Sequence, residues 1–165
     1  MRTYATIEST EQAKLLGEAI GQFQLQLSDF DGTTLHPTIP HFHDMSLRYE
    51  QLEKAKLVNF NNRLDMVKSE LDFLIANKER GEILWKEMEE GLLPTRVTHN
   101  DTKMNNVLFS SNGKEALCVI DLDTVMPGTI LFDTGDMIRT ATNTAAEDER
   151  DLNKVTCDIA LHKAL

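Results

Sequence analysis

Basic residues are scarce in this chain. Lys and Arg together number 17 against 27 Asp and Glu, which gives a formal net charge of −10. Because cationic side chains supply most of the affinity for a phosphodiester backbone, nucleic acid is excluded as an expected partner. Long apolar runs are also missing: no stretch approaches the roughly 20 residues that cross a bilayer, and the N-terminus lacks the apolar core of a secretion signal. We therefore expect a cytoplasmic protein with no membrane partner.

Cysteine is rare as well. Cys118 and Cys157 are the only two, and they fit neither a metal-binding spacing nor a disulfide framework. We predict that both are reduced and buried. The chain has 165 residues, of which 41% are hydrophobic, and this is enough for a single domain with its own hydrophobic core.

Before Pro94, apolar residues recur every three or four positions, which predicts amphipathic helices. The first helix carries Leu16, Ile20 and Phe23 on one face. Residues 28–43 contain prolines, histidines and Asp-Gly, so they are expected to form a loop. The helices are expected after Ser9 or Thr10, after Asp44, over residues 61–78, and before Gly91.

After Pro94 the pattern favours strands. Residues 96–98 are β-prone, and the apolar runs 107–109 and 117–120 flank Asn112-Gly113, a strong hairpin signal. The chain becomes helical again from about Phe132, and an amphipathic helix is expected over 151–163. These patterns predict an α+β fold that is mainly helical and has one small β-hairpin.

The most informative polar residues lie between and after these strands. His99, Asp101 and Asn106 form an H-x-D-x-x-x-x-N pattern in the loop that leads into the hairpin, and Asp121 ends its second strand. The hairpin would bring Asp121 back toward the loop. We expect His99 to brace the loop through hydrogen bonds.

This grouping suits phosphoryl transfer, in which a protein positions the acceptor and neutralises phosphate charge. Asp101 would orient a hydroxyl and accept its proton. Asn106 and Asp121 would bind Mg²⁺ and, through it, a nucleotide, because Mg²⁺ prefers oxygen ligands. Lys103 would neutralise the transferring group, and Asp123 would be an auxiliary metal carboxylate.

Two longer segments, residues 99–109 and 119–128, resemble the aminoglycoside phosphotransferase and choline kinase superfamily. Within that superfamily the chain looks most like the N-acetylhexosamine 1-kinases. Ile-Pro-His-Phe-His-Asp at 39–44 and Thr-Ala-Ala-Glu-Asp-Glu-Arg-Asp-Leu at 144–152 are also similar to that subgroup. The resemblance therefore covers nearly the whole chain.

The resemblance implies a protein-kinase-like C-terminal lobe in which the hairpin carries the catalytic loop. It implies Asp101 as catalytic base, Asn106 and Asp121 as Mg²⁺ ligands, ATP as phosphoryl donor and the anomeric hydroxyl of an N-acetylhexosamine as acceptor. By the same match, Asp133 would hold the backbone of the loop that contains Asp101. Capping of its own helix is the alternative role for Asp133.

The sequence also departs from the superfamily. Its members carry an N-terminal lobe with a phosphate-covering loop and a nucleotide-binding lysine, and neither feature precedes His99 here. We therefore expect residues 1–165 to correspond to the C-terminal lobe alone, without the final helices of the superfamily. The isolated chain is expected to have little kinase activity.

Three alternatives remain open. An aminoglycoside or a choline- or homoserine-type alcohol would be the acceptor if the acidic charge selects cations. Asp29-Phe-Asp31-Gly32-Thr33 matches the D-x-D-G-T motif of haloacid-dehalogenase-type phosphatases, with Asp29 as nucleophile, although helical spacing precedes it instead of a buried strand. Finally, the chain could be a non-catalytic fragment that self-associates through uncovered apolar surface.

Overall fold

The computed structural model describes residues 1–146 and 149–165. Helices dominate, and the strands form two small antiparallel sheets, so the predicted α+β class is confirmed. The chain divides into two compact units: residues 1–38 with 95–165, and residues 39–94. Glu147 and Asp148, which belong to the family-like segment 144–152, lie outside the described residues.

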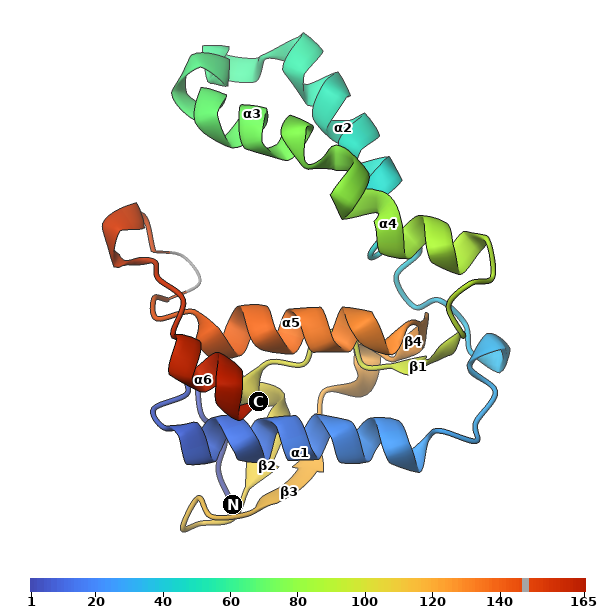
Figure 1. Cartoon of the computed structure of the whole chain (residues 1–165), viewed down its shortest axis with the longest axis vertical. Coiled ribbons are helices and arrows are strands. Elements are labelled where there is room, and N and C mark those ends of the chain that lie inside the picture. The colour runs from blue at the N-terminus through green and yellow to red at the C-terminus, as the bar shows by residue number, and fades with distance from the viewer. Residues whose placement is uncertain (147–148) are drawn as a thin grey trace. The chain divides into compact units, whose positions relative to one another are not determined.

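Helix α1 (Thr10–Gln26) opens the larger unit. The Ser9 hydroxyl accepts the backbone N–H of Gln12 at 3.2 Å, so the predicted N-cap is confirmed. Leu16 and Ile20 are buried on its inner face, as the periodicity predicted. They pack with side chains from the hairpin and from α5 to form the core, and Figure 1 shows α1 running alongside both.

Strand β2 (Val107–Phe109) pairs with β3 (Ala116–Val119), which confirms the predicted hairpin. Strand β1 (Arg96–Thr98) pairs with β4 (Met126–Gly128), which the sequence did not predict. Met-Pro-Gly is an unusual strand sequence because Pro cannot donate a ladder hydrogen bond. It is tolerated here because each strand of a two-stranded sheet is an edge strand.

Helix α5 (Ile130–Thr142) confirms the helix expected from about Phe132. The expected helix over 151–163 is wrong in its first half. Only a 3₁₀ turn (Leu152–Lys154) and the short helix α6 (Ile159–Ala164) form there. The carboxylate of Asp158 accepts the N–H groups of Ala160 and Leu161, so a new helix begins at this cap.

The smaller unit consists of α2 (Met45–Val58), α3 (Lys68–Ala76) and α4 (Lys78–Glu89). Asp44 caps α2 as predicted. The helix expected over 61–78 is confirmed only from Lys68, because Asn59 and Asn61 adopt left-handed backbone angles, with φ of 43° and 60°, that interrupt it.

Several large apolar side chains of the smaller unit are exposed. Leu57 is 87% exposed and Met66 is 79% exposed, and Phe60 and Phe73 also face solvent. Exposed apolar groups of this kind are where a self-association surface would lie. The expected self-association remains a prediction. No helix in the described ranges combines the length and hydropathy needed to cross a membrane.

Both cysteines are exposed, so the prediction of buried thiols is wrong. Cys118 lies on β3, whose outer edge has no strand beside it within the described residues. Cys157 follows the 3₁₀ turn and places its sulfur 3.3 Å from the Thr142 hydroxyl. Cys118 pairs with Leu108, whereas the neighbouring residues of β2, Val107 and Phe109, are fully buried. A sequence run of apolar residues does not reveal which face of the strand will be buried.

The D-x-D-G-T segment follows a helix end instead of a strand. Asp29 is exposed, and the Asp31 carboxylate accepts the backbone N–H and the hydroxyl of Thr33 at 3.0 and 2.6 Å, which fixes a turn. All strand pairs in the described ranges are antiparallel. The buried parallel strand that a phosphatase nucleophile requires is therefore not formed here.

Gly32 is buried in that turn for a packing reason. A Cβ added to it would lie 2.7 Å from the carbonyl carbon of Arg96, at the start of β1. Glycine is needed at this position because the turn and the strand backbone approach each other too closely for a side chain.

We expect Gly32→Ala to destabilise the chain by about 1–3 kcal/mol, because backbone must move to admit the methyl group. The matched control is Gly21→Ala on α1, where an added Cβ meets no atom of the described residues within 4 Å. That change should stabilise by about 0.5–1 kcal/mol, since Gly is a poor residue inside a helix. Urea unfolding followed by circular dichroism measures both, and equal effects of the two changes would refute the packing argument.

Candidate active site

The loop from His99 to Asn106 leaves the end of β1 and is held by carboxylates of α5. Asp133 is fully buried, and its two oxygens accept the N–H groups of His99 at 3.0 Å and of Asn100 at 2.7 Å. One turn later, Asp136 accepts the N–H of Thr102 at 2.8 Å. Residues three apart lie on the same helix face, so one face of α5 fixes the loop. Asp133 therefore holds the loop backbone, while Thr129 caps the helix.

His99 completes this support. Its side chain is fully buried; its Nδ1 lies 3.3 Å from the backbone nitrogen of Asp101 and its Nε2 lies 3.0 Å from the carbonyl oxygen of Ile120. Nδ1 must accept and Nε2 must donate, so these partners require the neutral imidazole protonated on Nε2. The contacts agree with the expected bracing role.

Asp101 is oriented by two of the predicted residues. The Asn106 Nδ2 donates to the Asp101 Oδ2 and to the Asp101 carbonyl oxygen, each at 2.8 Å. Lys103 places its Nζ 3.0 Å from the same Oδ2, and the Asp101 side chain keeps 26% of its exposure. Both side-chain contacts use Oδ2, so Oδ1 is the oxygen that can accept a hydrogen bond from another molecule.

Asp121 is brought to this loop by the residue before it. Ile120 donates its N–H to the Asn106 carbonyl at 2.8 Å, and its own carbonyl oxygen receives the His99 Nε2–H. Asp121 then adopts a left-handed backbone with φ of 66°, and Asn100 in the facing loop has the same φ. Non-glycine residues with positive φ are uncommon and are concentrated at functional sites.

Carboxylate crowding marks this end of the hairpin. The pKa of Asp121 is raised above its ordinary value, first by a hydrogen bond with Asp123 and by the charge of Asp123, then by burial and the charge of Asp101, while Lys103 acts in the opposite direction. Asp121 therefore lies within electrostatic range of three other predicted site residues. The structure gathers all five predicted residues around one place, since Asn106 contacts Asp101 directly.

These oxygen donors suit a hard cation that takes some of its ligands from the protein and the others from a phosphate group. Asp121 and Asp123 are exposed carboxylates, and both Asn106 contacts with Asp101 use its amide nitrogen, which leaves Oδ1 as its ligand atom. Among the described residues, no group of three or more His, Cys, Asp or Glu side chains could hold a metal by itself. Mg²⁺ commonly takes one or two carboxylates and completes its shell with water and phosphate oxygens.

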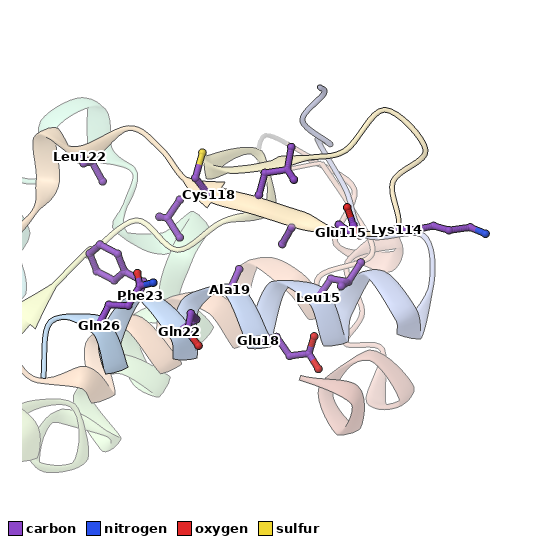
Figure 2. A pocket seen from close by; sticks show the side chains of 13 residues that line it. Leu15, Glu18, Ala19, Gln22, Phe23, Gln26, Lys114, Glu115, Cys118 and Leu122 are labelled. Atoms are coloured by element: carbon purple, nitrogen blue, oxygen red, sulfur yellow. The ribbon is translucent and has the colours of Figure 1, made fainter.

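A cavity of about 760 Å³ lies elsewhere, along the groove between α1 and β3. Figure 2 shows Leu15, Ala19 and Phe23 of α1 on one side of it and Cys118 of β3 on the other. None of the five predicted site residues lines this groove. Its size therefore does not identify the chemistry of the chain.

The sequence argument missed two supporting residues. Asp136 anchors Thr102, and the Thr124 hydroxyl donates to the His99 carbonyl at 2.7 Å, which ties the segment after Asp121 to the loop. The i,i+3 spacing of Asp133 and Asp136 on one helix could have indicated Asp136. Thr124 gives no comparable signal, because its partner lies 25 residues away.

Replacing Asp133 by Ala should destabilise the chain by about 3 kcal/mol, because two buried N–H groups of the loop lose their acceptor. The amide protons of His99 and Asn100 should then exchange with solvent much faster, as measured by NMR. Thr134→Ala is the control on the same helix; its exposed hydroxyl donates to the Ile130 carbonyl one turn earlier, so we expect a change within about 0.5 kcal/mol. Unchanged exchange in Asp133→Ala would contradict the assigned role.

One comparison with known proteins bears on this geometry. A model of the phosphotransferase enzyme family matches residues 2–155. The match includes the loop, the hairpin, Asp121 and the α5 carboxylates that support them. It agrees with the resemblance to the aminoglycoside phosphotransferase and choline kinase superfamily. The chain belongs to the phosphotransferase enzyme family.

Proposed function

We propose that this chain provides the acceptor and metal side of a kinase site, which transfers the γ-phosphoryl group of ATP to a hydroxyl of a small molecule. The observation that carries the proposal is the Asp101 carboxylate, positioned by Asn106 and Lys103 next to Asp121. Phosphoryl transfer needs this combination, because the acceptor must be oriented while negative charge is neutralised.

In the proposed mechanism, the Oδ1 of Asp101 accepts the hydrogen bond of the acceptor hydroxyl and takes its proton as the oxygen attacks phosphorus. Lys103, whose ammonium lies 3.0 Å from the Oδ2 of Asp101, offers positive charge on the same side. Asn106 and Asp121 would hold Mg²⁺, with Asp123 as an auxiliary carboxylate. The bound metal would neutralise charge on the nucleotide phosphates.

We propose an N-acetylhexosamine as acceptor, phosphorylated at its anomeric hydroxyl. Residues 39–44 and 144–152 support this substrate through their likeness to the N-acetylhexosamine 1-kinases. We place the activity in the cytoplasm, where ATP and Mg²⁺ are available and free thiols such as Cys118 persist. Residues 1–165 would act as a C-terminal lobe, so we expect slow turnover from the isolated chain.

Asp101→Asn should lower the rate of phosphoryl transfer by about 10²–10⁴-fold, the usual contribution of a general base. The assay follows radiolabelled phosphate from [γ-³²P]ATP to N-acetylglucosamine in the presence of Mg²⁺, with product separated by thin-layer chromatography. Asp72→Asn is the control, since its exposed carboxylate only pairs with Lys68 on α3. Where the unaltered chain transfers phosphate faster than the enzyme-free background, an equal rate for Asp101→Asn would exclude Asp101 as the base.

Mg²⁺ should raise the melting temperature of the chain, because it relieves repulsion among the crowded carboxylates at Asp121 and Asp123. Asp121→Ala should remove most of this increase and should also raise the melting temperature measured without Mg²⁺, since one repelling charge is gone. Differential scanning fluorimetry with and without millimolar Mg²⁺ measures both effects. Glu53→Ala, an exposed carboxylate of α2, should leave the Mg²⁺ effect unchanged; an unchanged effect in Asp121→Ala would exclude Asp121 as a ligand.

A further inference from the structure

The side chain of Asn100 is buried in the loop that carries Asp101, and the proposed mechanism gives it no role. Asn100 is 4% exposed, and its backbone is left-handed, with φ of 66°. Its backbone N–H donates to the Asp133 carboxylate at 2.7 Å. The backbone of Asn100 is therefore held by α5, and its side-chain amide makes contacts of its own.

That amide bonds to two separate segments. Its Nδ2 donates to the carbonyl oxygen of Thr98, at the end of β1, at 3.2 Å and to the carbonyl oxygen of Thr124 at 3.0 Å. Its Oδ1 accepts from the Thr98 hydroxyl at 3.2 Å. Exchanging the nitrogen and the oxygen would place Oδ1 against two carbonyl oxygens, so these partners fix the orientation of the amide.

The contact with Thr124 is reciprocal. While the Thr124 carbonyl accepts from Asn100, the Thr124 hydroxyl donates to the His99 carbonyl at 2.7 Å. Thr124 ends a short 3₁₀ turn that begins directly after Asp121 and contains Asp123. Residues 121–124 are named the metal-side turn below. Two hydrogen bonds therefore tie the end of this turn to the loop.

The metal-side turn is held from both directions against charge repulsion. On the side before Asp121, Ile120 bonds to the same loop through its N–H and carbonyl groups, and Thr124 does so on the side after it. The charges of Asp123 and Asp101 both act on Asp121. Without a cation, this repulsion favours a turn that moves away from the loop, so the hydrogen bonds at Thr124 oppose it.

Three residue types are the most tolerant of the left-handed backbone at position 100: glycine, asparagine and aspartate. Glycine has no amide. An ionised aspartate would present negative charge to two carbonyl oxygens in place of two donors. Asparagine is therefore the member of this group that combines the backbone conformation with both N–H donors.

We propose that Asn100 is a positioning residue, whose side-chain amide acts with the Thr124 hydroxyl to hold the metal-side turn against the loop before a cation binds. The inference rests on the proposed function, which gives the reason to keep Asp121 and Asp123 near Asp101. Releasing the turn lowers the apparent cation affinity in proportion to the fraction of molecules that keep the competent conformation.

Asn100→Gly tests this role, because it removes the amide and keeps a backbone that glycine adopts without strain. We expect the affinity for Mn²⁺, which like Mg²⁺ prefers oxygen ligands, to fall about tenfold, since loss of the bond to Thr124 frees the turn. Electron paramagnetic resonance of unbound Mn²⁺ measures this affinity for the 165-residue chain. Asn59→Gly is the matched control: Asn59 has φ of 43°, and its Oδ1 accepts the Leu64 N–H in the smaller unit, so the affinity should be unchanged.

A second readout needs no cation. The Val125 N–H donates to the Leu122 carbonyl at 3.1 Å and closes the metal-side turn. In Asn100→Gly its exchange with solvent, measured by NMR, should become about tenfold faster, because the turn opens more often. Thr124→Val removes only the hydroxyl that donates to His99, and it should also weaken Mn²⁺ binding.

Unchanged Mn²⁺ affinity in both Asn100→Gly and Thr124→Val would overturn the positioning role, as would unchanged exchange of the Val125 N–H in Asn100→Gly. An equal loss of affinity in Asn59→Gly would also overturn it. Faster Val125 exchange in Asn100→Gly, together with no Mn²⁺ binding to the unaltered chain, would support the hold on the turn and overturn the proposed metal role instead.

Discussion

The buried carboxylate of Asp133 is the constraint on which the candidate site depends. A loop that must expose Asp101 cannot satisfy its own backbone by forming a helix or a sheet, so its N–H groups need acceptors from elsewhere. Asp133 supplies two of these acceptors from α5 and Asp136 supplies a third. The His99 imidazole accepts the N–H of Asp101 itself. These bonds allow a loop without regular structure to hold one conformation.

Ile120 extends the same support to the second half of the site. Its N–H and carbonyl groups bond to the Asn106 backbone and to the His99 ring. The carboxylate of Asp121 is therefore placed next to Asp101 and Asp123 by backbone contacts, in spite of charge repulsion. A left-handed backbone at Asp121 adds strain to this repulsion. Such costs are concentrated at functional sites.

Helix α5 connects the loop with a smaller cavity of about 270 Å³, whose lining includes Lys103 and Arg139. Asp136 accepts from the loop through one oxygen and from Arg139 through the other. A change in α5 would therefore alter both the position of the Asp101 loop and the lining of the cavity. The loop and Arg139 therefore share one support on α5.

Local features of this chain were predictable from sequence. Caps such as Ser9 and Asp44 act on N–H groups two or three residues away, and the hairpin depends on a short turn between β-prone runs. The spacing of Asp101, Asn106 and Asp121 predicted that they share one site, and the structure brings these residues together. The family resemblance added the supporting role of Asp133.

Only the tertiary structure decided the rest, because the contacts responsible join residues far apart in sequence. Strand β4 exists because β1 is there to pair with it, although Pro127 and Gly128 argue against a strand. The helix expected over 151–163 is interrupted by the cap at Asp158. Cys118 is exposed because it pairs with Leu108, on the other face of the hairpin from the buried Val107 and Phe109. The contact of Asp136 with the loop and the cavity lined by Arg139 likewise form only because α5 packs against the loop, so the sequence alone does not indicate them.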